Sequence, residues 1–394
     1  MRILQVVSTP PFAWATGGCS RVVYGLSKAL SERGHDVTIM TTDQFESHQR
    51  YPAEELIKTV DNVKILRYRN LSDALAWRKI YFAPGMIFDL GNRIKNVDIV
   101  HLHDIISIHA IFVSKQCLQK NVPYVLTMHG SGIWLRRKAA LNYLLTKGFL
   151  IDVLRKAAYV TSMSEREHAD YRSLTINDDR IIDIPNGIDV EEFRKKVKKS
   201  EFRKMRSIET EEKIVLYLGR VHSSKHLELL LEAFAEVNAA HRDTRLVICG
   251  PDDGYISELQ AIAKGLGISE RMIVTGYLKE NEKIQAMTDS DVFVTPSFTG
   301  FPITFLEACI CRVPIVTTNL NDNLDWINNQ VGIVTNYNAT AMANAIERIL
   351  YDQDLAEKFR KNQQELLYSR FNWKMVAASL ENVYRRCIDE KKSN

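Results

Sequence analysis

The sequence lacks the features that mark several large classes of protein. No apolar run approaches the roughly 18 residues that a membrane-spanning helix needs, and the first residues show no secretory leader pattern. The six cysteines form neither a C-x-x-C pair nor a zinc-type spacing. We therefore expect reduced, mostly buried thiols in a cytoplasmic protein without a structural metal.

Charge and the common nucleotide fingerprints are sparse as well. The net charge of +4 is mild, and the charged stretch 191–213 has no strand pattern, so we expect solvated surface near a linker rather than a nucleic-acid-binding arm. No G-x-G-x-x-G occurs, which argues against a nicotinamide-dependent dehydrogenase. No acidic residue stands between Asp291 and Glu307, although a site for a charged, hydroxyl-rich ligand is expected to show a second acid near Glu307.

The length and the alternation of apolar runs predict two domains. A chain of 394 residues exceeds the usual size of a single core. In the first part, a helical pattern over 19–34 ends at its glycine, and buried-type strands follow one another between breakers. These strands are expected at 2–8, 35–42, 97–104, 123–130 and 157–164. This alternation of strands and helices predicts an N-terminal Rossmann-like domain over residues 1–190.

A second alternation begins at residue 213. Its strands are expected at 213–221, 245–250, 271–277, 291–297 and 314–318, with helical segments between them. It predicts a C-terminal Rossmann-like domain over 191–374, and residues 375–394 are expected to form a last helix and tail that pack back on the N-terminal domain. The predicted fold class is α/β with two doubly wound domains, in which ligands bind at the carboxyl ends of the strands and between the domains.

Two cations stand where a strand of the second domain ends. Arg220 follows Gly219 in the segment YLGRVHSSKH, and Lys225 comes at the start of the next helix. Arginine grips phosphate through two parallel hydrogen bonds, while lysine acts as a mobile point charge. Their place at the carboxyl end of a strand favours an anion site over the alternative of solvated surface charges.

The segment 296–314, PSFTGFPITFLEACICRVP, predicts a second element that binds an anion. Its turn at 300–302 places proline at the first helical position, where the missing N–H costs nothing. The next two N–H groups are then free for a diphosphate, and the helix dipole strengthens such binding. Glu307 lies about one turn further on, too far for the same phosphate, and suits the hydroxyls of a ribose.

Three further features are compatible with more than one role. The pair Gly17-Gly18, between the first strand and the first helix, suits either a phosphate-binding turn or a plain tight turn. His129 closes a strand and is either an active-site group or a capping side chain. His101 and His103 share one face of a strand, but no acidic or cysteine cluster completes a metal shell, so no metal site is predicted.

Taken together, these motifs resemble the retaining glycosyltransferases of family 4, also called glycosyl transferases group 1. That family has the GT-B fold, with two Rossmann-like domains that face each other across a cleft. The resemblance covers nearly the whole chain: GG with RGHDVTIMTT, then VDIVHLHD, TMHG, IPNGID, YLGR with its lysine, VICGP, VTGYL and PSFTGFPITFLEA. Each motif is modest alone, whereas their order and spacing together are specific.

The resemblance implies a hexosyltransferase that moves a sugar from a nucleoside-diphosphate sugar to a hydroxyl of a glycan or lipid-linked saccharide, with retention. The second domain is implied to bind the donor and the first the acceptor. No metal or cofactor is implied, because protein cations and helix dipoles neutralise the leaving diphosphate. The catalytic positions carried over are His129, Arg220 and Lys225. The donor-binding positions carried over are Gly17, Gly18, Arg220, Lys225, Gly276, Tyr277, Thr299, Gly300, Phe301, Pro302, Ile303, Thr304 and Glu307.

Three positions depart from the family pattern. Thr299 stands where the family has the first of two glutamates, Pro302 where glycine is usual, and His226 where a glycine follows the lysine. The missing acid is the one that the family uses on the donor sugar, whereas Glu307 is present. We therefore hypothesise that nucleotide binding is kept and sugar preference is altered, with loss of activity as the alternative.

Two other classes remain open. A sugar-nucleotide epimerase shares the two-domain architecture and consumes its donor without an acceptor. A non-catalytic subunit binds the nucleotide sugar but needs a partner for turnover. A requirement for an acceptor therefore excludes the first class, and turnover by the isolated chain excludes the second.

Segment 133–160 mixes cations with large apolar residues shortly after His129. Its cations are Arg136, Arg137, Lys138, Lys147, Arg155 and Lys156, against one acid, Asp152. Such a basic amphipathic helix can lie on an anionic bilayer, which suits a lipid-linked acceptor and a place on the cytoplasmic face of a membrane. The alternative is a core-facing helix whose charged residues are solvated.

Overall fold

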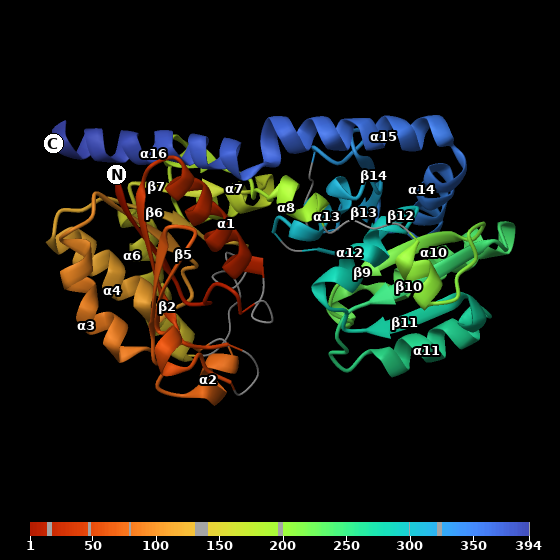
Figure 1. Cartoon of the computed structure of the whole chain (residues 1–394), viewed down its shortest axis with the longest axis horizontal. Coiled ribbons are helices and arrows are strands. Elements are labelled where there is room, and N and C mark those ends of the chain that lie inside the picture. Colours follow the sequence, from red (N-terminus) through yellow and green to blue (C-terminus); the bar gives the residue numbers. More distant parts are fainter. Residues whose placement is uncertain are drawn as a thin grey trace. The chain divides into compact units, whose positions relative to one another are not determined.

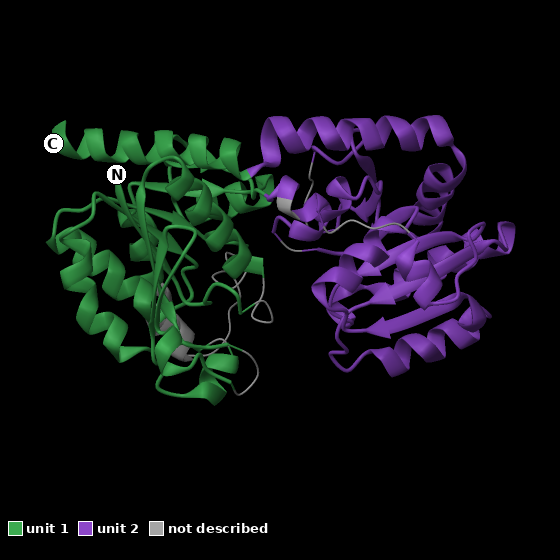
Figure 2. Ribbon diagram, in the orientation of Figure 1, with its two compact units in different colours: residues 1–187, 373–394 green, residues 188–372 purple. Residues whose placement is uncertain are grey.

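The computed structural model describes residues 1–13, 18–45, 49–78, 80–130, 141–195, 200–298, 300–320 and 325–393, and its elements are labelled in Figure 1. The chain forms two compact units (Figure 2). Unit 1 comprises Met1–Gly187 and Trp373–Asn394, and unit 2 comprises Ile188–Asn372. The sequence-based boundaries stand at residues 190 and 374, and the last helix, predicted from 375 onward, belongs to unit 1.

Within the described residues, unit 1 contains an eight-stranded sheet of order β3-β4-β2-β1-β5-β6-β7-β8. All neighbouring strands are parallel except β3, which is antiparallel to β4. The strands are β1 (Arg2–Val7), β2 (Asp36–Thr42), β3 (Ile57–Val60), β4 (Val63–Tyr68), β5 (Ile99–His103), β6 (Tyr124–Thr127), β7 (Tyr159–Ser162) and β8 (Ile181–Asp183). Strands β5, β6 and β7 are buried along their whole length, as parallel strands covered on both faces must be.

Helices cover both faces of this sheet. They are α1 (Gly18–Glu32), α2 (Asp73–Trp77), α3 (Pro84–Ile94), α4 (Ile108–Gln119), α6 (Leu141–Lys156), α7 (Glu165–Ser173) and α16 (Trp373–Ser393). Apolar residues of α3, α4 and α6 form one core with one face of the sheet. Residues of α1 and α16 form a second core with the other face. The last helix of the chain is therefore part of the layer that covers the first strand.

A tryptophan seats α16 between two glycines of unit 1. A Cβ atom at Gly25 would lie 2.4 Å from Nε1 of Trp373, and one at Gly187 would lie 2.5 Å from the same indole ring. Any side chain at either glycine would displace the ring. The start of α16 is thus fixed against α1, beside which it runs in Figure 1.

Unit 2 contains, among the described residues, a six-stranded parallel sheet of order β11-β10-β9-β12-β13-β14. Its strands are β9 (Lys213–Leu218), β10 (Thr244–Cys249), β11 (Met272–Gly276), β12 (Val292–Thr295), β13 (Ile315–Thr318) and β14 (Gly332–Thr335). Its helices are α8 (Val190–Arg194), α9 (Glu201–Met205), α10 (Leu227–Ala240), α11 (Ile256–Gly265), α12 (Glu280–Thr288), α13 (Ile303–Ile310), α14 (Ala339–Tyr351) and α15 (Gln353–Leu366). Apolar residues of α10, among them Leu227, Leu230 and Phe234, pack into the core of the unit with residues of α14.

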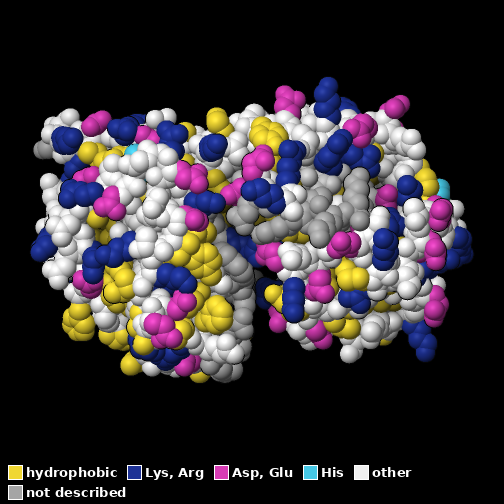
Figure 3. All heavy atoms as spheres, in the orientation of Figure 1, with side chains coloured by type: hydrophobic (Ala, Val, Ile, Leu, Met, Phe, Trp, Pro, Cys, Tyr) yellow, Lys and Arg dark blue, Asp and Glu magenta, His cyan; other side chains and the backbone are white. Residues whose placement is uncertain are grey.

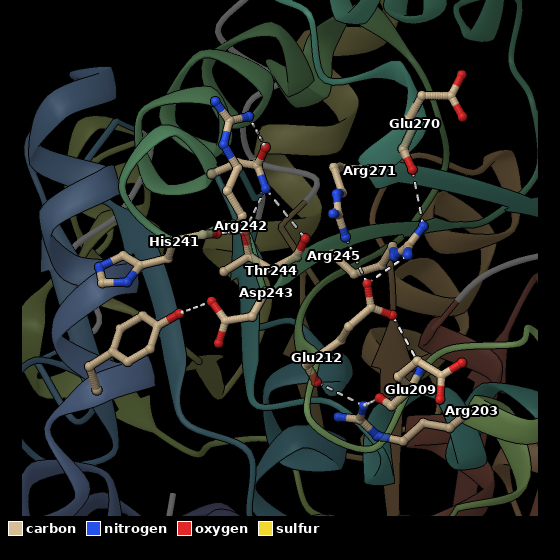
Figure 4. Close-up of polar contacts among 12 residues, drawn as sticks. Arg203, Glu209, Glu212, His241, Arg242, Asp243, Thr244, Arg245, Glu270 and Arg271 are labelled. Carbon is tan, nitrogen blue, oxygen red and sulfur yellow. Dashed lines mark hydrogen bonds and ion pairs between the residues drawn. The ribbon is translucent and has the colours of Figure 1, made fainter.

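A charged network joins the amino ends of three strands of unit 2 (Figure 4). Oε1 of Glu212, just before β9, accepts hydrogen bonds from Arg245 at 2.6 Å and from Arg271 at 2.9 Å. Arg203 donates to the carbonyl oxygens of Glu209 and Glu212 at 2.9 and 2.8 Å. These bonds hold the segment before β9 against β10 and β11. They lie at the amino edge of the sheet, opposite the edge where doubly wound sheets bind ligands.

The described helices and one face of the described surface bear on membrane binding and on charge. None of the described helices is long and apolar enough to cross a bilayer. On the face in Figure 3, the described acidic and basic side chains are intermingled. The six cysteines are free, and four are buried. The cations Arg136, Arg137 and Lys138 lie outside the described residues, while Val153 and Leu154 of α6 are buried in the core, so membrane binding stays a prediction.

Candidate active site

The strand orders place one candidate ligand edge in each unit. Ligands of doubly wound sheets bind at the carboxyl ends of the strands, where the strand order reverses. In unit 1 this reversal falls between β1 and β5, and in unit 2 it falls between β9 and β12. Gly18 is the exposed first residue of α1, at the first of these edges, whereas Gly17 lies outside the described residues.

His129 follows β6 in a backbone conformation that few side chains adopt. Its φ is 51°, and that of Gly130 is 79°, so two successive residues are left-handed. Buried Glu167 of α7 holds this turn: its Oε1 accepts the N–H of Gly130 at 3.0 Å, and its Oε2 accepts the N–H of Met163 at 2.8 Å. The glutamate thereby ties the loop after β6 to the loop after β7 and fixes the position of the histidine.

The ring of His129 belongs to a group of neutral histidines. Its Nε2 lies 3.0 Å from Nδ1 of His103, and the two rings are stacked. Burial lowers the pKa of His129 to about 4. Burial and, to a smaller extent, the positive charge that His129 would carry lower the pKa of His101 to about 3. Burial and the charges that His101 and His129 would carry hold the pKa of His103 well below its usual range. At neutral pH His129 therefore acts as a neutral hydrogen-bonding group.

These histidines are not arranged as a metal centre. Their ring nitrogens bond to one another, to Gln5, to Thr127 and to Tyr384 rather than to carboxylates. No group of three or more potential metal ligands occurs among the residues that the structure describes.

In unit 2, β11 ends in Gly276, and the neighbouring strands β10 and β9 are each followed directly by a glycine, Gly250 and Gly219. The N–H of Gly219 donates to the carbonyl of Cys249, and the N–H of Gly250 to that of Gly276, each at 2.9 Å. A Cβ atom at Gly250, whose φ is 148°, would lie 1.8 Å from the carbonyl oxygen of Gly219, so only glycine fits. Gly276, with φ 69°, faces open space, and Tyr277 beside it is 72% exposed. A flat group can approach the backbone of Gly276 closely.

The two predicted cations lie after β9. Arg220 is exposed and pairs with Asp253 at 2.7 Å. Lys225 ends the short 3₁₀ helix Ser223–Lys225, and no described residue pairs with its ammonium group. Its pKa is lowered by burial and by the positive charge of Arg220. The two like charges therefore repel each other in this structure, and a bound anion would relieve that repulsion.

His226 keeps the backbone conformation of a glycine. Its φ is 54°, in the left-handed region. Its Nδ1 lies 3.2 Å from a carboxylate oxygen of Glu228 and 3.0 Å from the hydroxyl of Tyr337. These contacts hold the imidazole toward α10 and α14, so the substitution changes the side chain but not the turn that follows Lys225.

The loop after β12 lies beside the loop that carries the cations. The hydroxyl of Ser297 donates to the carbonyl oxygen of Ser224 at 3.4 Å, next to Lys225. Thr299 lies outside the described residues. Gly300 has φ 64°, which favours glycine, and Phe301 is buried against Trp326, with ring centroids 5.5 Å apart. Phe301 therefore anchors the loop through its side chain.

The start of α13 differs by one residue from the prediction. Pro302 is not the first helical residue: it has ψ 125° and is the N-cap, so the helix begins at Ile303. The carbonyl of Pro302 already accepts the N–H of Phe305 at 3.2 Å, which is the role of a cap residue. Proline has no side-chain acceptor, so within the described residues the N–H groups of Ile303 and Thr304 receive no side-chain cap. Their binding of an anion stays a prediction.

Glu307 is buried, and only one of its two carboxylate oxygens has a hydrogen-bond partner among the described residues. It is 3% exposed, and its Oε1 accepts a hydrogen bond from Nζ of Lys283 at 2.6 Å. Its Oε2 has no hydrogen-bond partner among the described residues. An unpaired buried acceptor is costly, so a hydroxyl donor that reached this oxygen would be bound favourably.

Sequence reasoning missed the residues that support the predicted ones. Lys283, Asp253 and Glu167 each hold a predicted group or the turn that carries it. A signal existed only for Glu167, because Ser164-x-x-Glu167 has the capping-box pattern. The hydroxyl of Ser164 does accept the N–H of Glu167 at 3.3 Å, but the carboxylate bonds to the two neighbouring loops instead.

Two family models match nearly adjoining parts of the chain. The model Glycosyltransferase Family 4 matches residues 16–192, and Glycosyl transferases group 1 matches residues 198–366. The first match lies almost wholly in unit 1 and the second in unit 2. The chain therefore belongs to the family 4, or group 1, glycosyltransferases.

Whole-length relatives and solved structures agree with this assignment. A glycosyltransferase of Methanocaldococcus jannaschii is 24% identical over 392 residues, which cover 95% of each chain. N-acetyl-alpha-D-glucosaminyl L-malate synthase of Bacillus anthracis is 24% identical over 386 residues, 96% of each chain. Anabaena HepE, solved with UDP, superposes with a TM-score of 0.76 at 15% identity, covering 98% of this chain and 100% of HepE. The fold is that of the GT-B glycosyltransferases.

The lowered pKa values of these histidines predict that stability falls in mild acid. The unfolded chain binds a proton on each histidine near pH 6.5, whereas folded His129 does so only near pH 4. Between these values the unfolded state holds more protons, so the free energy of unfolding decreases as the pH falls. We expect the Tm to drop by about 5 °C between pH 7.5 and pH 5. Differential scanning calorimetry at both pH values measures this.

Two histidine variants separate this effect from general acid destabilisation. His129→Gln should reduce the pH dependence of the Tm, because it removes one group that must stay neutral in the fold. His222→Gln is the control, since this ring bonds to Ser224 at the surface. An equal pH dependence in all three proteins contradicts the assignment.

The Lys283–Glu307 pair predicts a strong stability effect in unit 2. Lys283→Met leaves a buried carboxylate without its cation, and we expect the free energy of unfolding to fall by about 3 kcal/mol. Lys283→Met combined with Glu307→Gln should recover part of this loss, because the uncompensated charge is then gone. Denaturant unfolding of each variant tests this, with exposed Lys264→Met as the control. A Lys283→Met protein as stable as the control shows that the pair is unimportant.

Proposed function

We propose that this glycosyltransferase transfers a hexose, with retention and without a metal, from a nucleoside-diphosphate sugar to a hydroxyl of a glycan or lipid-linked saccharide. The observation that carries the proposal is the polar set at the carboxyl edge of unit 2. Arg220 and Lys225 form a like-charged pair, and Glu307 keeps one buried oxygen that no described residue hydrogen-bonds. The first two suit a diphosphate and the third suits a ribose hydroxyl.

The diphosphate and the base of a nucleotide donor each have candidate partners in unit 2. Arg220 and Lys225 lie after β9, and the uncapped N–H groups of α13 lie beside them in the next loop of the sheet. Gly276 and Tyr277 offer bare backbone and an exposed ring to a base. Structures of HepE hold UDP, UDP with glucose, and UDP-glucose, which supports a nucleotide-sugar donor here.

The proposed reaction breaks and forms one bond at the anomeric carbon. The oxygen of the acceptor hydroxyl bonds to this carbon on the face from which the diphosphate leaves, and the diphosphate takes the bonding electron pair. The acceptor proton passes to an oxygen of the departing diphosphate. Arg220 and Lys225 neutralise the growing charge, which is the role that a divalent ion plays in metal-dependent transferases. His129 contributes a neutral hydrogen bond rather than a charge.

Binding of a panel of nucleotide sugars tests the donor site. We expect one nucleotide among UDP-, GDP-, ADP- and TDP-sugars to bind selectively in calorimetry. Arg220→Ala should weaken that binding about 30-fold and Glu307→Gln about 10-fold, since each removes a charged partner of the ligand. Arg312→Ala is the matched control, because Arg312 forms an exposed ion pair with Glu357 at 2.7 Å.

The same panel separates the competing functions. Donor consumption without any acceptor indicates an epimerase. Donor binding without turnover, restored by a partner protein, indicates a non-catalytic subunit. Absence of binding by every nucleotide sugar contradicts the proposed donor site itself.

Sugar preference is proposed to depend on Thr299. The family has an acid here that contacts the donor sugar, and a threonine offers only a neutral hydroxyl. Thr299→Glu should therefore change the ranking of donors that share one nucleotide, by about 10-fold in kcat/KM for at least one sugar. Thr299→Gln, which has the same length without the charge, is the control. An unchanged ranking in Thr299→Glu contradicts this role.

A further inference from the structure

A continuous polar network lies inside the otherwise apolar layer between the sheet of unit 1 and helix α16. Gln5 of β1 and His101 and His103 of β5 are at most 1% exposed. Gln5 pairs in register with His101, so these side chains point to the same face of the sheet. That face is the one covered by α1 and α16. Burying so many polar groups is costly unless they bond to one another.

One branch of this network ends on His129. Nε2 of His129 lies 3.0 Å from Nδ1 of His103, and Nε2 of His103 lies 2.6 Å from Oε1 of Gln5. Nε2 of Gln5 donates to the hydroxyl of Tyr384, on α16, at 3.4 Å. The branch therefore runs from the last helix of the chain, through the first strand, to the histidine at the ligand edge.

The other branch anchors the same tyrosine in the sheet. The hydroxyl of Tyr384 lies 2.6 Å from Nδ1 of His101, and Nε2 of His101 lies 2.8 Å from the hydroxyl of Thr127. Thr127 in turn bonds to the hydroxyl of Thr161 on β7. Tyr384 thus has a partner on each side, and its hydroxyl can accept from Gln5 while it donates to His101.

The orientation of the Gln5 amide fixes where the protons lie. Its oxygen faces His103, so Nε2 of His103 must carry a hydrogen. A neutral imidazole carries only one, so Nδ1 of His103 is an acceptor, and Nε2 of His129 must donate to it. The free nitrogen of His129, Nδ1, is then unprotonated. No described residue hydrogen-bonds to it.

We propose that Gln5, His103 and Tyr384 are positioning residues that hold His129 as the Nε2-protonated tautomer, so that its Nδ1 is presented at the carboxyl edge of the unit 1 sheet as an acceptor for a sugar hydroxyl. The sugar contact rests on the proposed function, whereas the tautomer does not. Burial favours the neutral form of all three histidines, so the arrangement persists across neutral pH. The last helix thereby acts on the ligand edge without touching the ligand.

The same hydrogen bonds could in principle form with every donor and acceptor of the branch exchanged, and this alternative makes the proposal testable. If the Gln5 amide were reversed, its NH₂ group would donate to His103, and each proton of that branch would move. His129 would then present an N–H at Nδ1 and could only donate to the sugar. The position of one proton on His129 therefore distinguishes the two arrangements.

Nuclear magnetic resonance of the ¹⁵N-histidine-labelled full chain reads this proton directly. Two-bond ¹H–¹⁵N correlations separate protonated from unprotonated ring nitrogens, and His129→Gln assigns the signals. We expect the Nε2-protonated tautomer in the ligand-free wild-type protein. Tyr384→Phe and Gln5→Met should give a mixture of tautomers at His129, because each removes a group that orders the protons. The Nδ1-protonated tautomer in the wild type overturns the proposal.

A second tyrosine on the same sheet supplies the matched control. Tyr159 of β7 also bonds to α16, through Glu390 at 2.7 Å, but lies outside the network. Tyr159→Phe should leave the tautomer of His129 and kcat/KM unchanged, whereas Tyr384→Phe should lower kcat/KM about ten-fold with nucleotide binding unaltered. Gln5→Met provides the same comparison if Tyr384→Phe does not fold. An unchanged tautomer in both network variants shows that they serve only to pack the core.

The sugar contact has its own measurement. The nucleotide sugar that binds in the donor panel, with UDP-glucose as the first probe, should shift the Nδ1 signal of His129, and the nucleotide diphosphate alone should not. Equal shifts by both overturn the contact with the sugar. If no nucleotide sugar binds, the proposed function fails, and the tautomer in the ligand-free protein still decides the role of the network.

Discussion

Burial of parallel strands on both faces is the constraint on which the rest of this structure depends. Strand β5 is buried at every residue, yet its sequence IVHLH contains two histidines. Neither ring can reach water, so each must bond to a polar group that the fold brings to the same layer. Gln5 and Tyr384, which are far apart in the sequence, meet this need. The first strand and the last helix are thus joined both directly, through Gln5 and Tyr384, and by the hydrogen bonds that these two residues form with the histidines.

Because the strands are buried on both faces, polar groups that could contact a ligand lie at the strand ends. A parallel strand covered on both faces can present side chains to a ligand only where it stops, and at the end of β11 in unit 2 Gly276 leaves the backbone open. The cations follow the end of β9, and the cap of α13 and Glu307 follow the end of β12. In unit 1 the equivalent position after β6 carries His129, held in a left-handed turn by Glu167. The polar edge of each unit is a consequence of its apolar interior.

The features that short sequence motifs determine could be predicted from the sequence. The strands that alternate with helices, the cations after β9 and the buried glutamate of α13 follow from short motifs, and the family comparison confirms the assignment and the fold. The antiparallel hairpin of β3 and β4 was not predicted, because in region 43–96 turn-forming residues do not clearly separate strand patterns from helix patterns. Partners such as Lys283 and Tyr384 were also missed. Their contacts join distant segments, and a charged or aromatic residue on a helix carries no signal of which strand it will meet.

The departures from the family pattern show which feature of the site is most constrained. His226 occupies a left-handed position where glycine is free of strain, a cost of about 1 kcal/mol or more for a side chain. The strain persists because Glu228 and Tyr337 bind the ring and because the turn delivers Lys225 to the edge of the sheet. Pro302 similarly removes an N–H from a residue that caps the helix, without moving those of Ile303 and Thr304. His226 and Pro302 thus leave Lys225 and the N–H groups of Ile303 and Thr304 at the carboxyl edge of the sheet, so the charges at this edge, rather than the identity of the turn residues, are what the proposed diphosphate would meet.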